Sequence, residues 1–157
     1  FKWLPVDLIP KLRAYARAGG RVLSIGARSL QAQAPLGHAG GVLTAGPPAP
    51  ISPDPFGARH GPISTTAGEL ITAQSDPLHI FGPAMALTGF HSFQTINPPN
   101  GVAASTAGVA AAAPTIVGFR VGRGRVIQIG LPGFASSLAR NVASQQLMGR
   151  LWTLLSS

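Results

Sequence analysis

The segment from Leu4 to Gly26, LPVDLIPKLRAYARAGGRVLSIG, restricts the possible folds of this chain more than any other segment. Between Pro5 and Ala18, apolar side chains recur at the spacing of one helix face, which predicts an amphipathic helix. The side chains on that face are Leu8, Ile9, Leu12, Tyr15 and Ala16. Gly19 and Gly20 can take the left-handed conformation that ends a helix, and RVLSIG is typical of a strand buried on both faces of a parallel sheet. A helix, a glycine stop and a buried strand form half of a βαβ unit, so we expect a preceding strand that this chain does not contain.

The C-terminal part has the clearest pattern. PTIVGFRV and RVIQIG flank the turn GRG, whose glycines Gly122 and Gly124 permit positive φ, and this predicts a β-hairpin. A loop after Gly130 leads into a final helix from about Ala143 to Leu155. The apolar face of that helix carries Leu147, Leu151, Leu154 and Leu155. Together with the N-terminal unit, this order predicts an α/β layer structure that is incomplete at its N-terminus.

The middle of the chain is rich in glycine and proline. Residues 31–62 include GPPAPISPDPFG, which has the period of neither helix nor strand, so we expect a loop-rich insertion there. The weak alternation in ISTTAGELITA predicts an edge strand or a hairpin. No side chain between Asp76 and Arg120 is formally charged, but this stretch is mostly small residues and is interrupted by Pro114. It therefore does not predict a membrane span.

Composition places the chain among single globular domains. Its 157 residues are 45% hydrophobic and 10% charged, which argues against disorder, and a chain of this length can bury a core without disulfides or structural metals. The absence of cysteine excludes disulfides, thiolate zinc sites and a cysteine nucleophile. The net charge of +8 comes from 12 basic and 4 acidic residues. Because the bases are spread along the chain and belong to no recognised nucleic-acid module, we expect no nucleic-acid partner.

Three parts of the sequence resemble the second half of a class I glutamine-amidotransferase-like, flavodoxin-like domain: LPVDLIPKLRAYARAGGRVLSIG, VGFRVGRGRVIQIGLPGF and the final helix. The branches that they resemble most are the ThuA-like and N,N-dimethylformamidase large-subunit-like proteins. The resemblance covers residues 4–30 and 76–157. It implies a flavodoxin-like layered sheet with flanking helices. These are framework motifs, which carry fold rather than function.

The same resemblance argues against glutaminase chemistry. In amidotransferases of this class the strand ends in G-I-C-x-G, and the cysteine sits on a strained turn at the carboxyl edge of the sheet. When this motif is laid on S-I-G-A-R, the nucleophile position falls on Gly26, which has no side chain. Metal chemistry of the dimethylformamidase type would need oxygen ligands, and the chain offers only Tyr15, Glu69 and three scattered aspartates.

A serine nucleophile is the remaining catalytic option. Ser29 follows the predicted strand at the edge where open α/β sheets bind ligands, and it would need a histidine as base. The candidate bases are His60, His79 and His91. Asp54 or Asp76 would orient one of them. However, IGARSL lacks the G-x-S-x-G elbow, and a serine at this position also fits a helix N-cap.

The histidines do not predict a metal site, and nothing predicts a cofactor. His38, His60, His79 and His91 are separated by 22, 19 and 12 residues, without the close pairing of zinc ligands on one element.

Arg120, Arg123 and Arg125 cluster at the predicted hairpin turn. Strand alternation points Arg123 into solvent and can bring Arg120 and Arg125 to one face. There they could receive an anion or the acidic surface of a neighbouring domain. A solvated turn is the alternative.

We therefore expect one α/β domain over residues 1–157 with a structural or accessory role in a larger protein, as a non-catalytic or incomplete amidotransferase-like domain. The alternatives are a hydrolase of carbon–nitrogen or ester bonds and a small-ligand or carbohydrate-binding module that uses the uncharged loops from Pro77 to Asn100. The expected partners are the missing N-terminal part, which Phe1 and Trp3 would contact, another subunit, or a second copy of the chain. No targeting segment is visible, and we expect a soluble protein.

Overall fold

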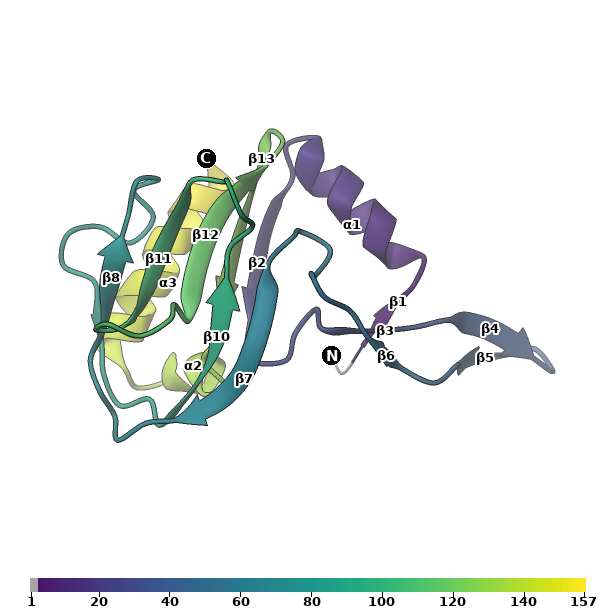
Figure 1. Cartoon of the computed structure of the whole chain (residues 1–157), viewed down its shortest axis with the longest axis horizontal. Helices are drawn as coiled ribbons and strands as arrows, with labels where there is room; N and C mark the ends of the chain where they lie inside the picture. Colours follow the sequence, from purple (N-terminus) through teal and green to yellow (C-terminus); the bar gives the residue numbers. More distant parts are fainter. Residues whose placement is uncertain (1–2) are drawn as a thin grey trace.

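The computed structural model describes residues 3–157, and strands dominate it (Figure 1). The described helices are α1 (Leu8–Arg17), α2 (Phe134–Ser137) and α3 (Val142–Ser156). The described strands before residue 70 are β1 (Leu4–Pro5), β2 (Arg21–Ile25), β3 (Ala32–Ala34), β4 (Leu36–Ala39), β5 (Val42–Ala45), β6 (Ala49–Pro50) and β7 (Arg59–Thr65). Those after it are β8 (Ile71–Ser75), β9 (Ala86–Leu87), β10 (Ser92–Asn97), β11 (Ala104–Val109), β12 (Ile116–Val121) and β13 (Gly124–Ile129). Phe1 lies outside the described residues, and so does the contact predicted for it.

A six-stranded sheet with the order β2-β13-β12-β11-β8-β9 forms the centre of the fold. Only β13 and β2 pair in parallel, and the other neighbours are antiparallel. Short connections join β11 to β12 and β12 to β13, and such connections make antiparallel pairs because a parallel pair needs a crossover of a dozen or more residues. The prediction of a flavodoxin-like layered α/β fold is therefore wrong. The chain is a mostly-β domain with one parallel strand pair at an edge of its main sheet.

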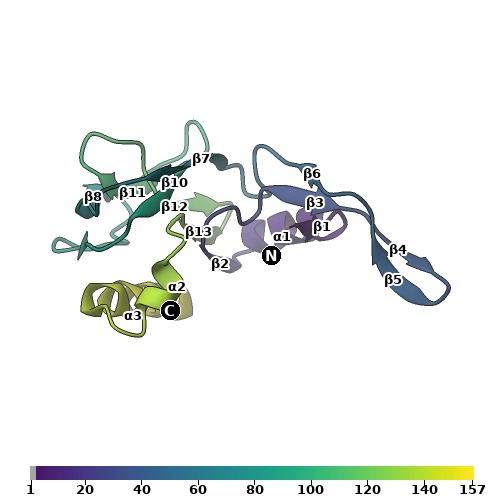
Figure 2. The same cartoon turned by 90° about the horizontal axis from the view of Figure 1, so that it is seen from below.

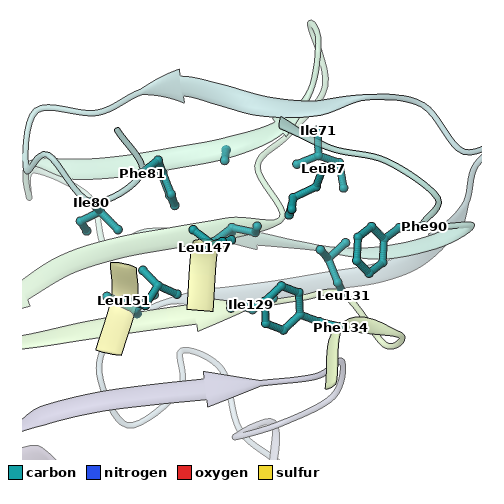
Figure 3. Packing of buried hydrophobic residues seen from close by; sticks show 13 residues of the cluster. Ile71, Ile80, Phe81, Leu87, Phe90, Ile129, Leu131, Phe134, Leu147 and Leu151 are labelled. Atoms are coloured by element: carbon teal, nitrogen blue, oxygen red, sulfur yellow. The ribbon is translucent and has the colours of Figure 1, made fainter. Parts of the chain in front are cut away.

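The helices α2 and α3 cover one face of the main sheet (Figure 2). Leu147 and Leu151 of α3 and Phe134 of α2 pack into one core cluster with Ile129 of β13 (Figure 3). Ile127 of β13 belongs to the same cluster. The rings of Phe90 and Phe134 stack there with centroids 6.3 Å apart. Burial of each such side chain contributes about 1.5–3 kcal/mol to folding, so this face holds α3 firmly on the sheet.

The opposite face of the sheet is covered by α1, β10 and the segment around Phe56. Ala16 of α1, Ile96 of β10 and Phe56 form a second core with Phe119 and Val126 of the sheet. β10 pairs antiparallel with β7 in a separate two-stranded sheet. On the predicted apolar face of α1, Ala16 is buried and Ile9 and Leu12 are half-buried, whereas Leu8 and Tyr15 are exposed.

Residues 31–62 contain more structure than the predicted loop. β1, β3 and β6 form a small three-stranded sheet, and β4 and β5 form a hairpin that extends away from the body of the molecule (Figure 1). Every residue of β4 and β5 is exposed. These strands are too short and too exposed to produce a hydrophobic period, which is why the sequence did not reveal them.

The predicted terminal elements are confirmed. The first helix, the strand after it, the hairpin and the final helix correspond to α1, β2, β12 with β13, and α3. β2 pairs in parallel with β13, but it is the terminal strand of the sheet and none of its residues is fully buried, so the prediction of a strand buried on both faces is wrong. Gly122 has a φ of 57° in the hairpin turn, the positive value predicted for it, whereas Gly124 does not have a positive φ. The segment ISTTAGELITA contributes to β7 and β8, which belong to different sheets. Within residues 3–157, no helix has the length and apolar character needed to cross a membrane.

Candidate functional site

The turn after β2 holds Ser29, the candidate nucleophile. Within residues 3–157 no helix begins there, because β3 follows, so the alternative of a helix N-cap is wrong. Ser29 Oγ donates a hydrogen bond to the carbonyl of Gly26 at 3.1 Å, and no hydrogen bond within residues 3–157 joins it to a histidine. The turn has positive φ at Gly26 (103°), Arg28 (62°) and Leu30 (63°), which is uncommon for residues with a side chain. Gln94 holds this backbone in place because its Oε1 accepts a hydrogen bond from the Arg28 N–H at 2.8 Å.

His60 and Asp54 form a buried pair. His60 Nε2 lies 2.7 Å from Asp54 Oδ2, and the two side chains are 5% and 0% exposed. Gln128 Nε2 donates to the same oxygen at 2.7 Å, and the N–H groups of Phe56 and Ala58 donate to Oδ1. Four donors thus surround this carboxylate inside the protein, an arrangement that links β7 and β13 to the segment before β7.

Asp76 fixes the backbone of the loop after β8. The N–H groups of Ile80, Phe81 and Gly82 donate to its carboxylate at 2.7–3.1 Å. Partial burial opposes the charge, but the hydrogen bonds from Ser105 and from these three N–H groups outweigh it and lower the pKa of Asp76 from its usual 3.8. The side chain is therefore used for structure.

The other histidines are exposed and separate from one another. His38 lies on the projecting hairpin strand β4, His79 has a φ of 54° in the loop after β8, and His91 precedes β10. Within residues 3–157 no three His, Cys, Asp or Glu side chains gather closely enough to hold a metal ion.

A broad hollow of about 750 Å³ lies beside the residues between β9 and β10. His91, Arg140 and Asn141 line it, and it coincides with part of the uncharged loops predicted to bind a small ligand. Asn141 is occupied as the N-cap of α3, where it accepts from Ser144 N–H at 3.1 Å and donates to the Thr88 carbonyl. The aromatic side chain in its wall, Phe90, is 5% exposed and offers no ring face to a sugar.

Two exposed aromatic side chains stand beside the free edge of the main sheet. Tyr15 of α1 and Trp152 of α3 are 55% and 66% exposed, and both line a hollow of about 350 Å³. Arg21 and Leu23 of β2 and Leu155 of α3 also line it. We call these five residues the β2-edge face. The sequence placed Tyr15 on the buried face of its helix and gave no signal for Trp152, because exposure of an apolar position depends on which elements cover it.

The basic cluster also gains a residue that sequence reasoning missed. Arg120, Arg123 and Arg125 lie close together, as predicted, and line a hollow of about 170 Å³. Arg21 of β2 lines the same hollow. Arg21 could have been found from the sequence only by placing β2 next to β13 in the correct register.

Comparisons with known proteins identify the fold. No family model and no curated protein matches the chain. Among solved structures, it is similar to a β-galactosidase from Rahnella sp. R3, with a TM-score of 0.62 and 16% identity over 99% of this chain. It is also similar to a β-galactosidase from the Antarctic haloarchaeon Halorubrum lacusprofundi, with a TM-score of 0.52 and 22% identity over 96% of this chain.

The chain spans about one fifth of the length of these enzymes, 21% in both cases. At this level of identity the likeness shows a shared fold. The solved structures that it resembles are glycosidases, which corrects the expectation of an amidotransferase-like, flavodoxin-like α/β domain.

Proposed function

We propose that this chain is a non-catalytic accessory domain of a larger glycosidase-like protein, and that the β2-edge face packs against the rest of that protein. The observation that carries the proposal is the match of nearly the whole chain to about one fifth of two β-galactosidases. If this chain is likewise about one fifth of a larger protein, part of its surface packs against the remaining four fifths.

The acidic residues support a non-catalytic role. Glycoside hydrolysis ordinarily uses two carboxyl groups that flank the bond to be broken. This chain has four carboxylate side chains, of which Asp54 is enclosed by four donors and Asp76 holds a loop. Asp7 before α1 and Glu69 between β7 and β8 are both exposed and lie on separate elements. No two of them are left to act as a pair in an open hollow.

The β2-edge face supports packing against another part of a protein. Exposed tryptophan, tyrosine and arginine are the side chains most enriched at the centres of protein interfaces. β2 is also the terminal strand of the main sheet and pairs only with β13 within the described residues. An open edge of this kind is a template for a further strand.

Hydrogen exchange tests this proposal in the native full-length protein and in the 157-residue chain alone. We expect the amides of β2 and of the C-terminal half of α3 to exchange more slowly in the full-length protein. A Trp152→Ser variant should reduce that protection, whereas Val142→Ser, which changes an equally exposed residue at the other end of α3, should not. Equal exchange of β2 and α3 in both proteins would contradict the proposed packing.

A hydrolysis assay tests the non-catalytic part. Ser29→Ala, His79→Ala and His91→Ala in the full-length protein should leave the rate with a nitrophenyl galactoside within about twofold of the unmodified protein, because none of these side chains would touch the reacting bond. A loss of two or more orders of magnitude at Ser29 and one histidine would replace the proposal with the hydrolase alternative.

A further inference from the structure

Three arginines occupy one row across three neighbouring strands. In the register of the main sheet, Arg120 of β12 is opposite Arg125 of β13, and Arg125 is opposite Arg21 of β2. Residues directly opposite one another point to the same face of a sheet, with Cβ atoms about 4.5–5.5 Å apart in antiparallel pairs. We call these residues the arginine row.

The same alternation shows which face carries the arginine row. Ile127 and Ile129 follow Arg125 at intervals of two along β13 and pack in the core beneath α3. The arginine row therefore lies on the α3 face, just beyond the end of the apolar core. Arg21 confirms this position, because its Nη1 donates to the carbonyl of Leu155 at 3.1 Å.

No acidic side chain of the described residues compensates the charge of the arginine row. Like charges directly opposite one another on a sheet destabilise it. Within residues 3–157, the one side-chain ion pair joins His60 to Asp54, and no carboxylate side chain lines the arginine hollow. Ser157 at the C-terminal end of α3 also lines the hollow, and in a chain that ends there its terminal carboxylate would add one negative charge, which is small against the four guanidinium groups of Arg21, Arg120, Arg123 and Arg125.

The hollow at the arginine row has the size of a site for a small anionic group. Its volume is about 170 Å³, below the roughly 300 Å³ at which pockets for whole organic ligands begin. Arg123, on the hairpin turn, adds a fourth guanidinium to the walls. A guanidinium presents five N–H donors in a planar fork that matches the oxygen atoms of phosphate, sulfate and carboxylate groups.

We propose that Arg21, Arg120, Arg123 and Arg125 form a binding site for one oxoanion, either a free ion or an anionic group carried by a ligand. The bound oxoanion neutralises the like charges that the sheet register forces together. This inference does not depend on the proposed accessory function, because it concerns the charges of this chain alone.

The alternative, a hairpin turn whose arginines are covered only by water, predicts a different dependence on salt. If water alone covered these arginines, all salts of equal ionic strength would screen their repulsion equally. A site built for an oxoanion instead distinguishes phosphate or sulfate from chloride and saturates as the site fills.

The test is thermal unfolding of the chain as a function of inorganic phosphate, with sodium chloride adjusting every sample to the same ionic strength. The matched variants are Arg120→Gln/Arg125→Gln in the arginine row and Arg59→Gln/Arg140→Gln as a control. The control pair removes the same charge from exposed positions outside the hollow. A phosphorus NMR titration of the unmodified chain measures binding without any variant.

We expect phosphate to raise the Tm of the unmodified chain and of the control variant saturably, and to leave the Tm of the arginine-row variant unchanged. In chloride alone the arginine-row variant should unfold at the same or a higher temperature than the unmodified chain, because like charges have been removed.

Sulfate and acetate distinguish the sources of the anion. A preference for phosphate and sulfate identifies a tetrahedral anion, a preference for acetate identifies a carboxylate, and either supports the site.

Two results would overturn the proposal. The first is an equal effect of phosphate, sulfate, acetate and chloride at matched ionic strength, together with no phosphorus line broadening. The second is equal loss of the phosphate effect in the control and arginine-row variants, which would show that net charge alone is responsible.

Discussion

His60 Nε2 lies 2.7 Å from Asp54 Oδ2 in the interior of the protein, and neither side chain is more than 5% exposed. The carboxylate also accepts from Gln128, which is 74 residues further along the chain. This contact ties the irregular segment before β7 to β13, an interior strand of the main sheet. A buried carboxylate is tolerated only when donors replace the water that it loses, and here four donors do so.

Asp54→Ala should lower the free energy of unfolding by about 3–5 kcal/mol, because it leaves the donors of His60, Gln128 and two backbone amides without their acceptor in a buried place. Urea unfolding followed by circular dichroism measures the change. Asp7→Ala is the control, since the Asp7 side chain is exposed and makes no capping hydrogen bond, and it should change stability by less than about 0.5 kcal/mol. A loss below about 1 kcal/mol for Asp54→Ala would contradict the buried network.

Asp76→Asn should lower stability at neutral pH by about 1–3 kcal/mol, because hydrogen bonds to a charged acceptor are stronger than those to a neutral one. The pKa of Asp76 is lowered in the folded protein, so its contribution is complete above the unfolded value of 3.8 and declines as the pH falls through the lower folded value. The difference between the two proteins should therefore shrink as the pH drops below 3.8. Unfolding curves between pH 7 and pH 2 check this, and a difference independent of pH would refute the charge contribution.

The sequence revealed the elements whose pattern is local. α1, β2, the β12–β13 hairpin and α3 each carry a period or a glycine that marks their ends, and all four are present. The antiparallel pairs of β11 with β12 and β8 were missed, because the helices at the two ends of the chain resemble α/β units and no pattern in the sequence of β11 predicted a strand.

In the candidate sites too, contacts between residues close in the sequence could be predicted, whereas contacts between distant residues could not. Arg120 and Arg125 are five residues apart across a predicted turn, so their proximity could be expected. Arg21 joins them only through the pairing of β2 with β13. The contact of Asp54 with Gln128 spans 74 residues and has no periodic signal at either end. Contacts between residues so far apart in the sequence depend on the whole fold, and local sequence patterns do not predict them.

Two glycine-to-alanine substitutions should have opposite effects. A Cβ at Gly124 would lie 2.0 Å from the Ala16 carbonyl oxygen and 2.4 Å from that of Gly20, both rigid backbone atoms, so α1 and β13 would have to separate. Gly124→Ala should cost about 1–3 kcal/mol or more. A Cβ at Gly149 meets nothing within 4 Å on the exposed side of α3, and alanine there should stabilise the helix by about 0.5–1 kcal/mol. Thermal unfolding of both variants checks the prediction, and a stable Gly124→Ala protein would show that α1 does not sit as closely on β13 as described.

Gln94 is the residue on which the unusual turn after β2 depends. Its Oε1 accepts from the N–H of Arg28, and its Nε2 donates to the Gly61 carbonyl at 2.9 Å and to Gln31 Oε1 at 3.1 Å. Gln94→Leu keeps a side chain of similar size but satisfies none of these groups, and each polar group left buried costs about 1–3 kcal/mol.

Because positive φ at Arg28 and Leu30 persists only where the surroundings impose it, Gln94→Leu should release the turn before the rest of the fold. Hydrogen exchange should accelerate at residues 26–31, while the amides of β12 and β13, which lie in the centre of the main sheet, keep most of their protection. Gln74→Leu is the matched control: its amide also donates to two carbonyls, those of Val109 and Ala112, but it lies at an exposed position on β8. Uniform acceleration across the whole chain would mean that Gln94 supports global stability alone, and unchanged exchange at the turn would mean that the backbone of residues 26–31 holds its conformation without this side chain.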